Sequence, residues 1–126
     1  HVWLGVTAED QQRADERIPI LLSIPAAKRF VSTEPMLGPV DLLERGYLAD
    51  HEWKKGTPGG LDWVICGGET GPRRRHANPN WVRSLRDQCA QAGVAFWLKQ
   101  LDIDGKVVGM PVLDEQVWQE RPVLAF

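Results

Sequence analysis

Cysteine is scarce in this sequence, since Cys66 and Cys89 are the only two among 126 residues. They form no CxxC pair, so a disulfide scaffold and a zinc or iron–sulfur site made of cysteine alone are excluded. Long apolar runs are missing too, because none approaches the roughly 20 residues of a membrane-spanning helix. We therefore expect a protein of the reducing cytoplasm that has no membrane partner.

An excess of charge of one sign is also lacking, since 15 Lys and Arg stand against 17 Asp and Glu, a formal net charge of −2. The chain as a whole therefore has no electrostatic attraction to nucleic acid or to a membrane, and any anion site must be a local patch. The sequence contains no P-loop, no GxGxxG fingerprint and no arguable serine–histidine–aspartate triad. Its hydrophobic content of 43% is typical of one globular domain.

Four short apolar runs, rich in β-branched and aromatic residues, predict β-strands at residues 2–6, 29–31, 63–66 and 94–98. Polar and apolar residues do not alternate cleanly in any of them. Continuous hydrophobicity is typical of strands that are covered on both faces, and therefore of a parallel sheet. Of the six tryptophans, we assign Trp81 and Trp97 to the core and leave open whether the others are core or pocket residues (Trp3, Trp53, Trp63 and Trp118).

Helical patterns lie between these runs. Residues 80–92 place Trp81, Leu85 and Cys89 on one face, and Asn78 supplies an N-cap in front of them. A second helix is predicted over residues 10–22, where Pro19 should kink it or split it. A short amphipathic helix between residues 42 and 53 and a loop at residues 54–60 are expected after that.

The alternation of strands and helices predicts an α/β fold made of βαβ units around a parallel sheet, which we interpret as half of a (β/α)₈ TIM-type barrel. We expect residues 1–126 to form a single α/β domain, with an irregular insertion at residues 37–61 and a C-terminal tail at residues 106–126. Because the chain opens inside a strand pattern without an initiating methionine, we interpret it as the C-terminal half of a longer protein.

Charged side chains follow the carboxyl ends of the predicted strands, which is where ligands bind in parallel α/β folds. We call these positions the rim: Glu9, Glu34, Glu69, Lys99 and Gln100. Because parallel strands end at the same edge of a sheet, the three glutamates and Lys99 are predicted to converge there as candidate catalytic residues.

Several interpretations of the rim stay open. Together with His76, the carboxylates could hold a divalent metal, although a lone loop histidine is usually not a ligand. With Lys99, they could form an acid/base set around an organic substrate. The simplest alternative is that the glutamates cap the helices that follow, but helix capping gives Lys99 no role.

The segment VICGGETGPRRRH combines bare backbone with clustered guanidinium groups. Gly67 and Gly68 allow a sharp turn and a close approach of another group. Arg73, Arg74 and Arg75 suit phosphate or carboxylate recognition, or they pair with surface acids. We treat these five residues and Gln100 as candidate substrate-binding residues.

The pieces ADERIP, EPMLGPVDL, DWVICGGETG and FWLKQ, in this order, resemble the phage gp-thirty-seven/gp-sixty-eight-type protein family, a domain of unknown function carried by phages and bacteria. The resemblance implies a distant similarity to radical-SAM-type barrels. It implies no cofactor in this chain, but an iron–sulfur cluster and SAM in the full-length protein. The residues Glu9, Glu34, Glu69 and Lys99 would then line the substrate side of the site.

Our leading hypothesis is the substrate-side half of a radical-SAM-like enzyme that acts on an anionic or nucleic-acid-related substrate, with phosphate as the candidate anionic group. One alternative is a non-catalytic module in which the arginines and Lys54–Lys55 bind phosphates of nucleic acid. The other is a structural fragment that forms homo-oligomers through an open edge of its sheet.

Overall fold

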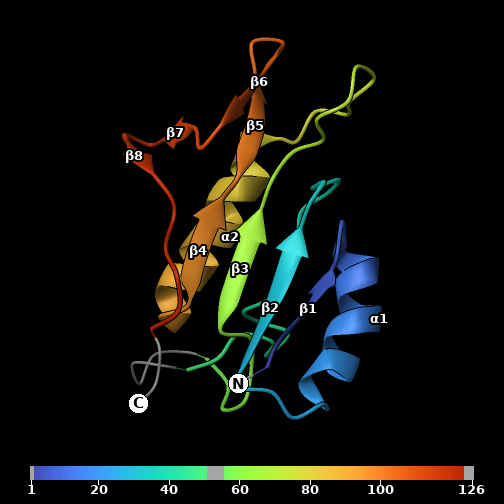
Figure 1. The fold of residues 1–126 in the computed structure, drawn as a ribbon, viewed down its shortest axis with the longest axis vertical. Coiled ribbons are helices and arrows are strands. Elements are labelled where there is room, and N and C mark those ends of the chain that lie inside the picture. Colours follow the sequence, from blue (N-terminus) through green and yellow to red (C-terminus); the bar gives the residue numbers. More distant parts are fainter. Residues whose placement is uncertain (1, 51–55, 124–126) are drawn as a thin grey trace.

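The computed structural model describes residues 2–50 and 56–123. Its centre is a four-stranded parallel sheet in the order β1-β2-β3-β4 (Figure 1). The strands are β1 (Trp3–Thr7), β2 (Lys28–Thr33), β3 (Trp63–Cys66) and β4 (Ala95–Leu98). The predicted parallel sheet and its four strands are therefore confirmed, with β2 longer than the apolar run that indicated it.

Two helices connect these strands, α1 (Gln11–Leu22) after β1 and α2 (Pro79–Ala92) after β3. The Asp10 side chain caps α1 by accepting a hydrogen bond from the Arg13 amide at 2.9 Å. α1 runs through Pro19 as one helix, so of the predicted kink or split the split does not occur. Asn78 caps α2, and Gly93 ends it in the left-handed conformation at φ 74°.

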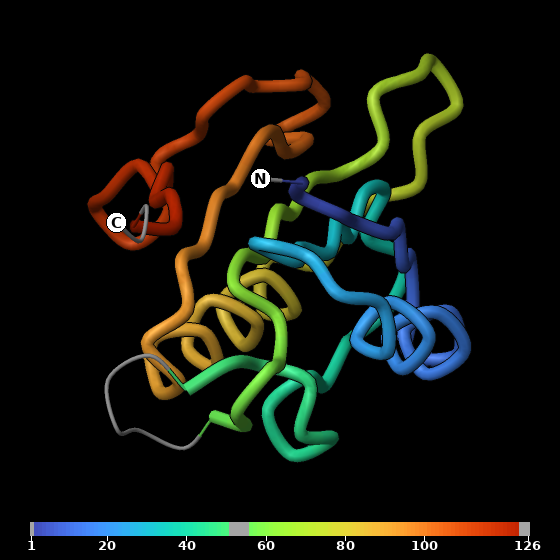
Figure 2. Tube along the Cα trace, turned by 60° about the horizontal axis from the view of Figure 1, so that its bottom comes forward, coloured from blue at the N-terminus to red at the C-terminus, as the bar shows by residue number. Residues whose placement is uncertain are grey.

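Both helices cover the same face of the sheet. Their buried residues, such as Ile18 and Leu85, belong to one core cluster with the alternate strand residues Val31, Val64 and Phe96. In Figure 2 both helices lie below the strands. The intervening residues of each strand point away from the helices, and we call this side the open face. In the described part of the chain no helix covers it.

The fold therefore differs from the predicted half of a TIM-type barrel, and that prediction was wrong. The structure is a small mixed α/β fold in which a parallel sheet has cover on one face. The chain after β4 forms antiparallel hairpins instead of another βα unit: β5 (Gln100–Ile103) with β6 (Lys106–Gly109), and β7 (Val112–Leu113) with β8 (Gln116–Val117). The sequence predicted cover on both faces because β3 and β4 are apolar throughout, whereas in the structure buried and half-buried residues alternate along them.

The segment between β2 and β3 packs on the helical side without forming a helix in its described residues. The amides of Leu42 and Leu43 donate to the Gln88 side chain of α2 at 2.7 and 3.1 Å, so they take no part in a helical ladder. Gly46 then turns the chain with φ 75°. The end of the expected helix and the start of the expected loop fall at residues 51–55, outside the described residues.

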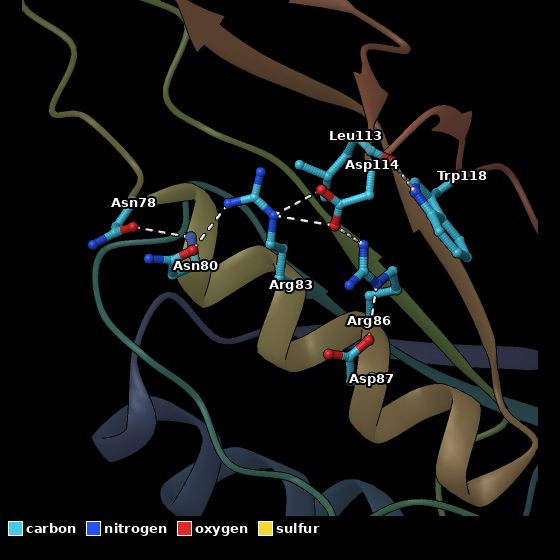
Figure 3. Close-up of polar contacts among 8 residues, drawn as sticks. All are labelled: Asn78, Asn80, Arg83, Arg86, Asp87, Leu113, Asp114 and Trp118. Carbon is cyan, nitrogen blue, oxygen red and sulfur yellow. Dashed lines mark hydrogen bonds and ion pairs between the residues drawn. The ribbon is translucent and has the colours of Figure 1, made fainter.

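The chain beyond β7 is fixed to α2 by an ion-pair network (Figure 3). Arg83 and Arg86 both contact the Asp114 carboxylate, and Arg86 also lies over the Trp118 ring, 5.1 Å from its centroid. Hydrogen bonds from Arg86, its principal partner, lower the pKa of the Asp114 carboxyl. This contact directs residues 118–120 along the outer edge of β4, where the Leu98 amide donates to the Trp118 carbonyl at 2.8 Å.

One edge of the sheet is thus covered by the chain's own tail, while β1 forms the other edge. Among the described residues, no helix has the length and apolar character needed to cross a membrane.

Candidate functional site

The rim continues the open face, because side chains alternate along a strand. In β2, Phe30 and Ser32 point to the open face, and Glu34 is the next residue on that side. The same alternation leads to Gly67 after β3 and to Lys99 after β4. Neighbouring strands are in register, so these positions come together at one edge of the sheet.

A hydrogen-bonded cluster of three side chains forms there. The Glu34 carboxylate accepts from the side-chain amide of Gln100 and lies 3.3 Å from the Lys99 ammonium. Gln100 is 6% exposed and also donates to the Gly68 carbonyl at 2.6 Å. Lys99 has a side chain that is 58% exposed, whereas that of Glu34 is 24% exposed. The cluster therefore has a held carboxylate and a freely accessible cation.

Gly67 makes this cluster possible. A Cβ atom at this position would lie 2.6 Å from Nε2 of Gln100 and 3.1 Å from Oε2 of Glu34. The bare backbone therefore leaves the room in which the amide and the carboxylate meet. Gly68 contributes its carbonyl oxygen, and its own amide donates to the Gln100 backbone carbonyl at 2.9 Å.

Backbone hydrogen bonds hold the ends of the strands in place around the cluster. The Met36 amide donates to the Gly67 carbonyl at 2.9 Å, and the Lys99 amide donates to the Cys66 carbonyl at 2.8 Å. The loop that starts at Glu34 also reaches the first strand, because the Leu37 amide donates to the Glu9 carbonyl at 2.9 Å. Main-chain hydrogen bonds therefore fix the positions of the rim residues.

Glu9 and Glu69 lie on the rim but have other partners. Glu69 forms hydrogen bonds with Arg75, whose guanidinium approaches to 2.9 Å and lowers the pKa of the carboxyl. Glu9 pairs with Arg17 of α1 at 3.5 Å. Only Glu34 and Lys99, of the four predicted catalytic residues, share a contact in the described structure, so sequence order alone did not show which rim residues meet.

The three arginines of the loop after β3, Arg73 to Arg75, also differ in their partners. Arg74 is mostly buried and pairs with Asp102 of β5 at 2.6 Å, while Arg75 forms an ion pair with Glu69. Arg73 is exposed, and no hydrogen bond or ion pair is found for it among the described residues. His76 lies exposed on the same loop. Arg73 is thus the arginine of this loop that is available to a ligand.

Neither cysteine is suited to bind a metal. Both thiols are buried, and burial raises the pKa of Cys66 to about 12 and that of Cys89 well above its ordinary value. Residues 2–50 and 56–123 contain no group of three or more His, Cys, Asp or Glu side chains that could hold a metal ion. An iron–sulfur cluster therefore does not fit these residues.

The open face below the rim carries aromatic rings that sequence reasoning placed only in part. Trp63 is at the centre, with ring centroids 6.1 Å from Trp3, 6.0 Å from Phe30 and 6.2 Å from Trp97. The assignment of Trp97 to the buried core overlooked that it occupies the half-buried position of an alternating strand. Both alternate sets of residues in β3 and β4 are apolar, so nothing in the sequence indicated which set faces away from the helices.

A family model described as a protein of unknown function, DUF5131, matches residues 1–122. The chain belongs to the DUF5131 family. Searches of curated proteins and of solved structures found no match. The DUF5131 match confirms that part of the expected resemblance which predicted a domain of unknown function. It gives no evidence of a phage association or of a likeness to radical-SAM barrels.

Proposed function

We propose that this DUF5131 domain binds a phosphate-bearing anionic ligand at the rim, with Lys99 as the primary contact. The observation that carries the proposal is the cluster in which Lys99 and Gln100 hold the Glu34 carboxylate beside the bare backbone of Gly67. Such a group of convergent polar side chains at the carboxyl ends of parallel strands is the usual ligand position of an open α/β sheet.

The charges of the cluster suit a ligand that has both an anionic group and a hydrogen-bond donor. The Lys99 ammonium is more than half exposed, so a phosphate can approach it without displacing protein atoms. Glu34 is fixed by Gln100 and accepts hydrogen bonds only, so it suits a donor on the same ligand. Arg73 adds a second cation on the adjacent loop.

Titration calorimetry with inorganic pyrophosphate tests this proposal. We expect Lys99→Ala to weaken binding by about tenfold or more, because a hydrogen bond to a charged group contributes about 1.5–3 kcal/mol. Arg13→Ala is the matched control, since it removes one exposed positive charge from α1 on the far side of the sheet. Equal affinities of the two variants would refute the proposal.

An enzymatic role for the same site has support from the position of Glu34. Its carboxylate is three-quarters shielded and touches an ammonium group, so it is placed to orient a ligand or to exchange a proton with it. Under this hypothesis Glu34→Gln keeps ligand binding and loses turnover. The iron–sulfur cluster, SAM and a phage setting, all expected for a longer protein, stay predictions.

A further inference from the structure

The open face is unusual for a parallel sheet, because such sheets nearly always have both faces covered. Here it exposes Trp3, which is 37% accessible, beside the half-buried rings of Phe30, Trp63 and Trp97. We call these four side chains the aromatic platform. A contiguous apolar surface of this kind normally marks a binding site.

Small residues allow the rings to lie over the sheet. A Cβ atom on Gly5 would fall 2.2 Å from the Phe30 ring, so this ring occupies the space above β1. Ala95 is the register partner of Trp63, whose indole N–H reaches past β4 to the Glu120 carbonyl at 2.9 Å. Trp63 stands nearly perpendicular to Trp3 and Trp97, at 88° and 80°, so the rings present edges and faces in turn, and the exposed Trp3 is the ring on which a base can stack.

Cations border the platform. Lys28 lies on the open face at the amino end of β2, and Arg121 lies over the Trp97 ring, 5.1 Å from its centroid. Lys99 stands at the opposite end, on the rim. The four strands of the sheet contain no acidic residue. Lys99 is paired with Glu34, so Lys28 and Arg121 are the cations that stand beside strands without carboxylates, in a chain with a net charge of −2.

We propose that the open face binds single-stranded nucleic acid, with bases stacked on the aromatic platform and phosphates facing Lys28, Arg121 and Lys99. Cations along the backbone path combined with aromatic rings on which bases stack are the means by which single strands are held without a sequence preference. From Lys28 at the start of β2 to Glu34 just beyond its end, the chain spans about 20 Å at roughly 3.3 Å per residue. That length suits a short site of about four nucleotides.

A second copy of the chain is a poorer occupant of this face. Two open faces packed together would bury Lys28 and Arg121 between rings, and the strands offer no carboxylate to pair with them. Burial of unpaired charges is costly. A single strand instead brings its own phosphates to these cations, while its bases supply the planar surfaces that the rings need.

Fluorescence anisotropy can test the inference with two labelled probes of about eight nucleotides. One is oligothymidylate, and the other is an abasic strand with the same phosphates. We expect Trp3→Ala to weaken oligothymidylate binding by about fivefold or more and to leave abasic binding unchanged, because stacking involves the base alone. Trp3→Phe should restore most of the affinity. Ile20→Ala, an exposed apolar position on α1, is the matched control.

The inference rests on the proposed function for its Lys99 contact, and the two can fail separately. Equal affinity for both probes, or equal binding by Trp3→Ala and Ile20→Ala, overturns the stacking role. Unchanged binding of both probes by Lys99→Ala overturns the rim contact alone. Arg121→Ala leaves the four rings in place and should weaken the binding of both probes. It therefore tests the open face even if Trp3→Ala is unstable. A stable dimer that neither probe dissociates would overturn the inference in favour of a second copy.

Discussion

Gly67→Ala adds one methyl group at the place where β2, β3 and β4 contribute to the rim. The new Cβ would lie 2.6 Å from Nε2 and 3.1 Å from Cδ of Gln100. Gln100 has little freedom to move away, because it is 6% exposed and its amide already donates to Glu34 and to the Gly68 carbonyl. The methyl group and the hydrogen-bonded amide therefore cannot keep their present positions together.

The loss of stability in Gly67→Ala follows from the hydrogen bonds that the Gln100 side-chain amide loses. A neutral hydrogen bond contributes about 0.5–1.5 kcal/mol and one to a charged group about 1.5–3 kcal/mol. If the Gln100 side chain rotates away, it loses one bond of each kind. Partial relaxation should reduce the sum, so we expect the free energy of unfolding to fall by about 2 kcal/mol.

Urea unfolding followed by tryptophan fluorescence measures this cost, and Gly71→Ala is its control. A Cβ on Gly71 would meet no atom within 4 Å, so that variant should stay within about 0.5 kcal/mol of the parent. Because both glycines belong to the same connection after β3, the pair separates the clash from a general effect of alanine. If Gly67→Ala is as stable as Gly71→Ala, the cluster is not packed as described.

Two further predictions concern the interior and the open face. Burial, with a hydrogen bond to Asp15, raises the pKa of Tyr47 to about 12, so this sole tyrosine should titrate by ultraviolet absorbance about two units above its ordinary value. The neutral phenol is favoured in the fold. Its stabilisation is full below about pH 10 and is lost as the pH rises to about 12, whereas Asp15→Asn should lower that midpoint. Gly5→Ala should cost about 1–3 kcal/mol in urea unfolding through its clash with Phe30, and adding Phe30→Leu should recover most of it. An unchanged Tyr47 midpoint near 10, or full stability of Gly5→Ala alone, would contradict these expectations.

Local sequence signals were sufficient for the regular elements. The apolar run at residues 63–66 became β3 with the predicted bounds, and the run at 94–98 became β4 with a shift of one residue. For α2, the Asn78 cap and Gly93 stop both lie where the pattern puts them. These features depend on residues within a few positions of one another, so their physical causes are visible in a linear sequence.

The larger architecture could not be read in the same way. The half-barrel prediction extended a βαβ pattern beyond β4, but Asp104 and Gly105 turn the chain with positive φ angles and start an antiparallel hairpin. Residues 42 and 43 look amphipathic and would suit a helix. They form no helix because their amides donate hydrogen bonds to the side chain of Gln88, which is 46 and 45 positions away.

The sequence by itself determined that the chain forms a parallel α/β sheet whose strands end in polar residues, because apolar runs, caps and strand ends are local properties. Only the tertiary structure decided that Glu34 meets Lys99 while Glu69 turns to Arg75, and that four rings gather on a face without cover. Partners of a side chain depend on strand register and on competing contacts 65 positions apart in the chain. Contacts between residues so far apart in the chain leave no local pattern in the sequence. The partners of the rim side chains are therefore set by tertiary packing.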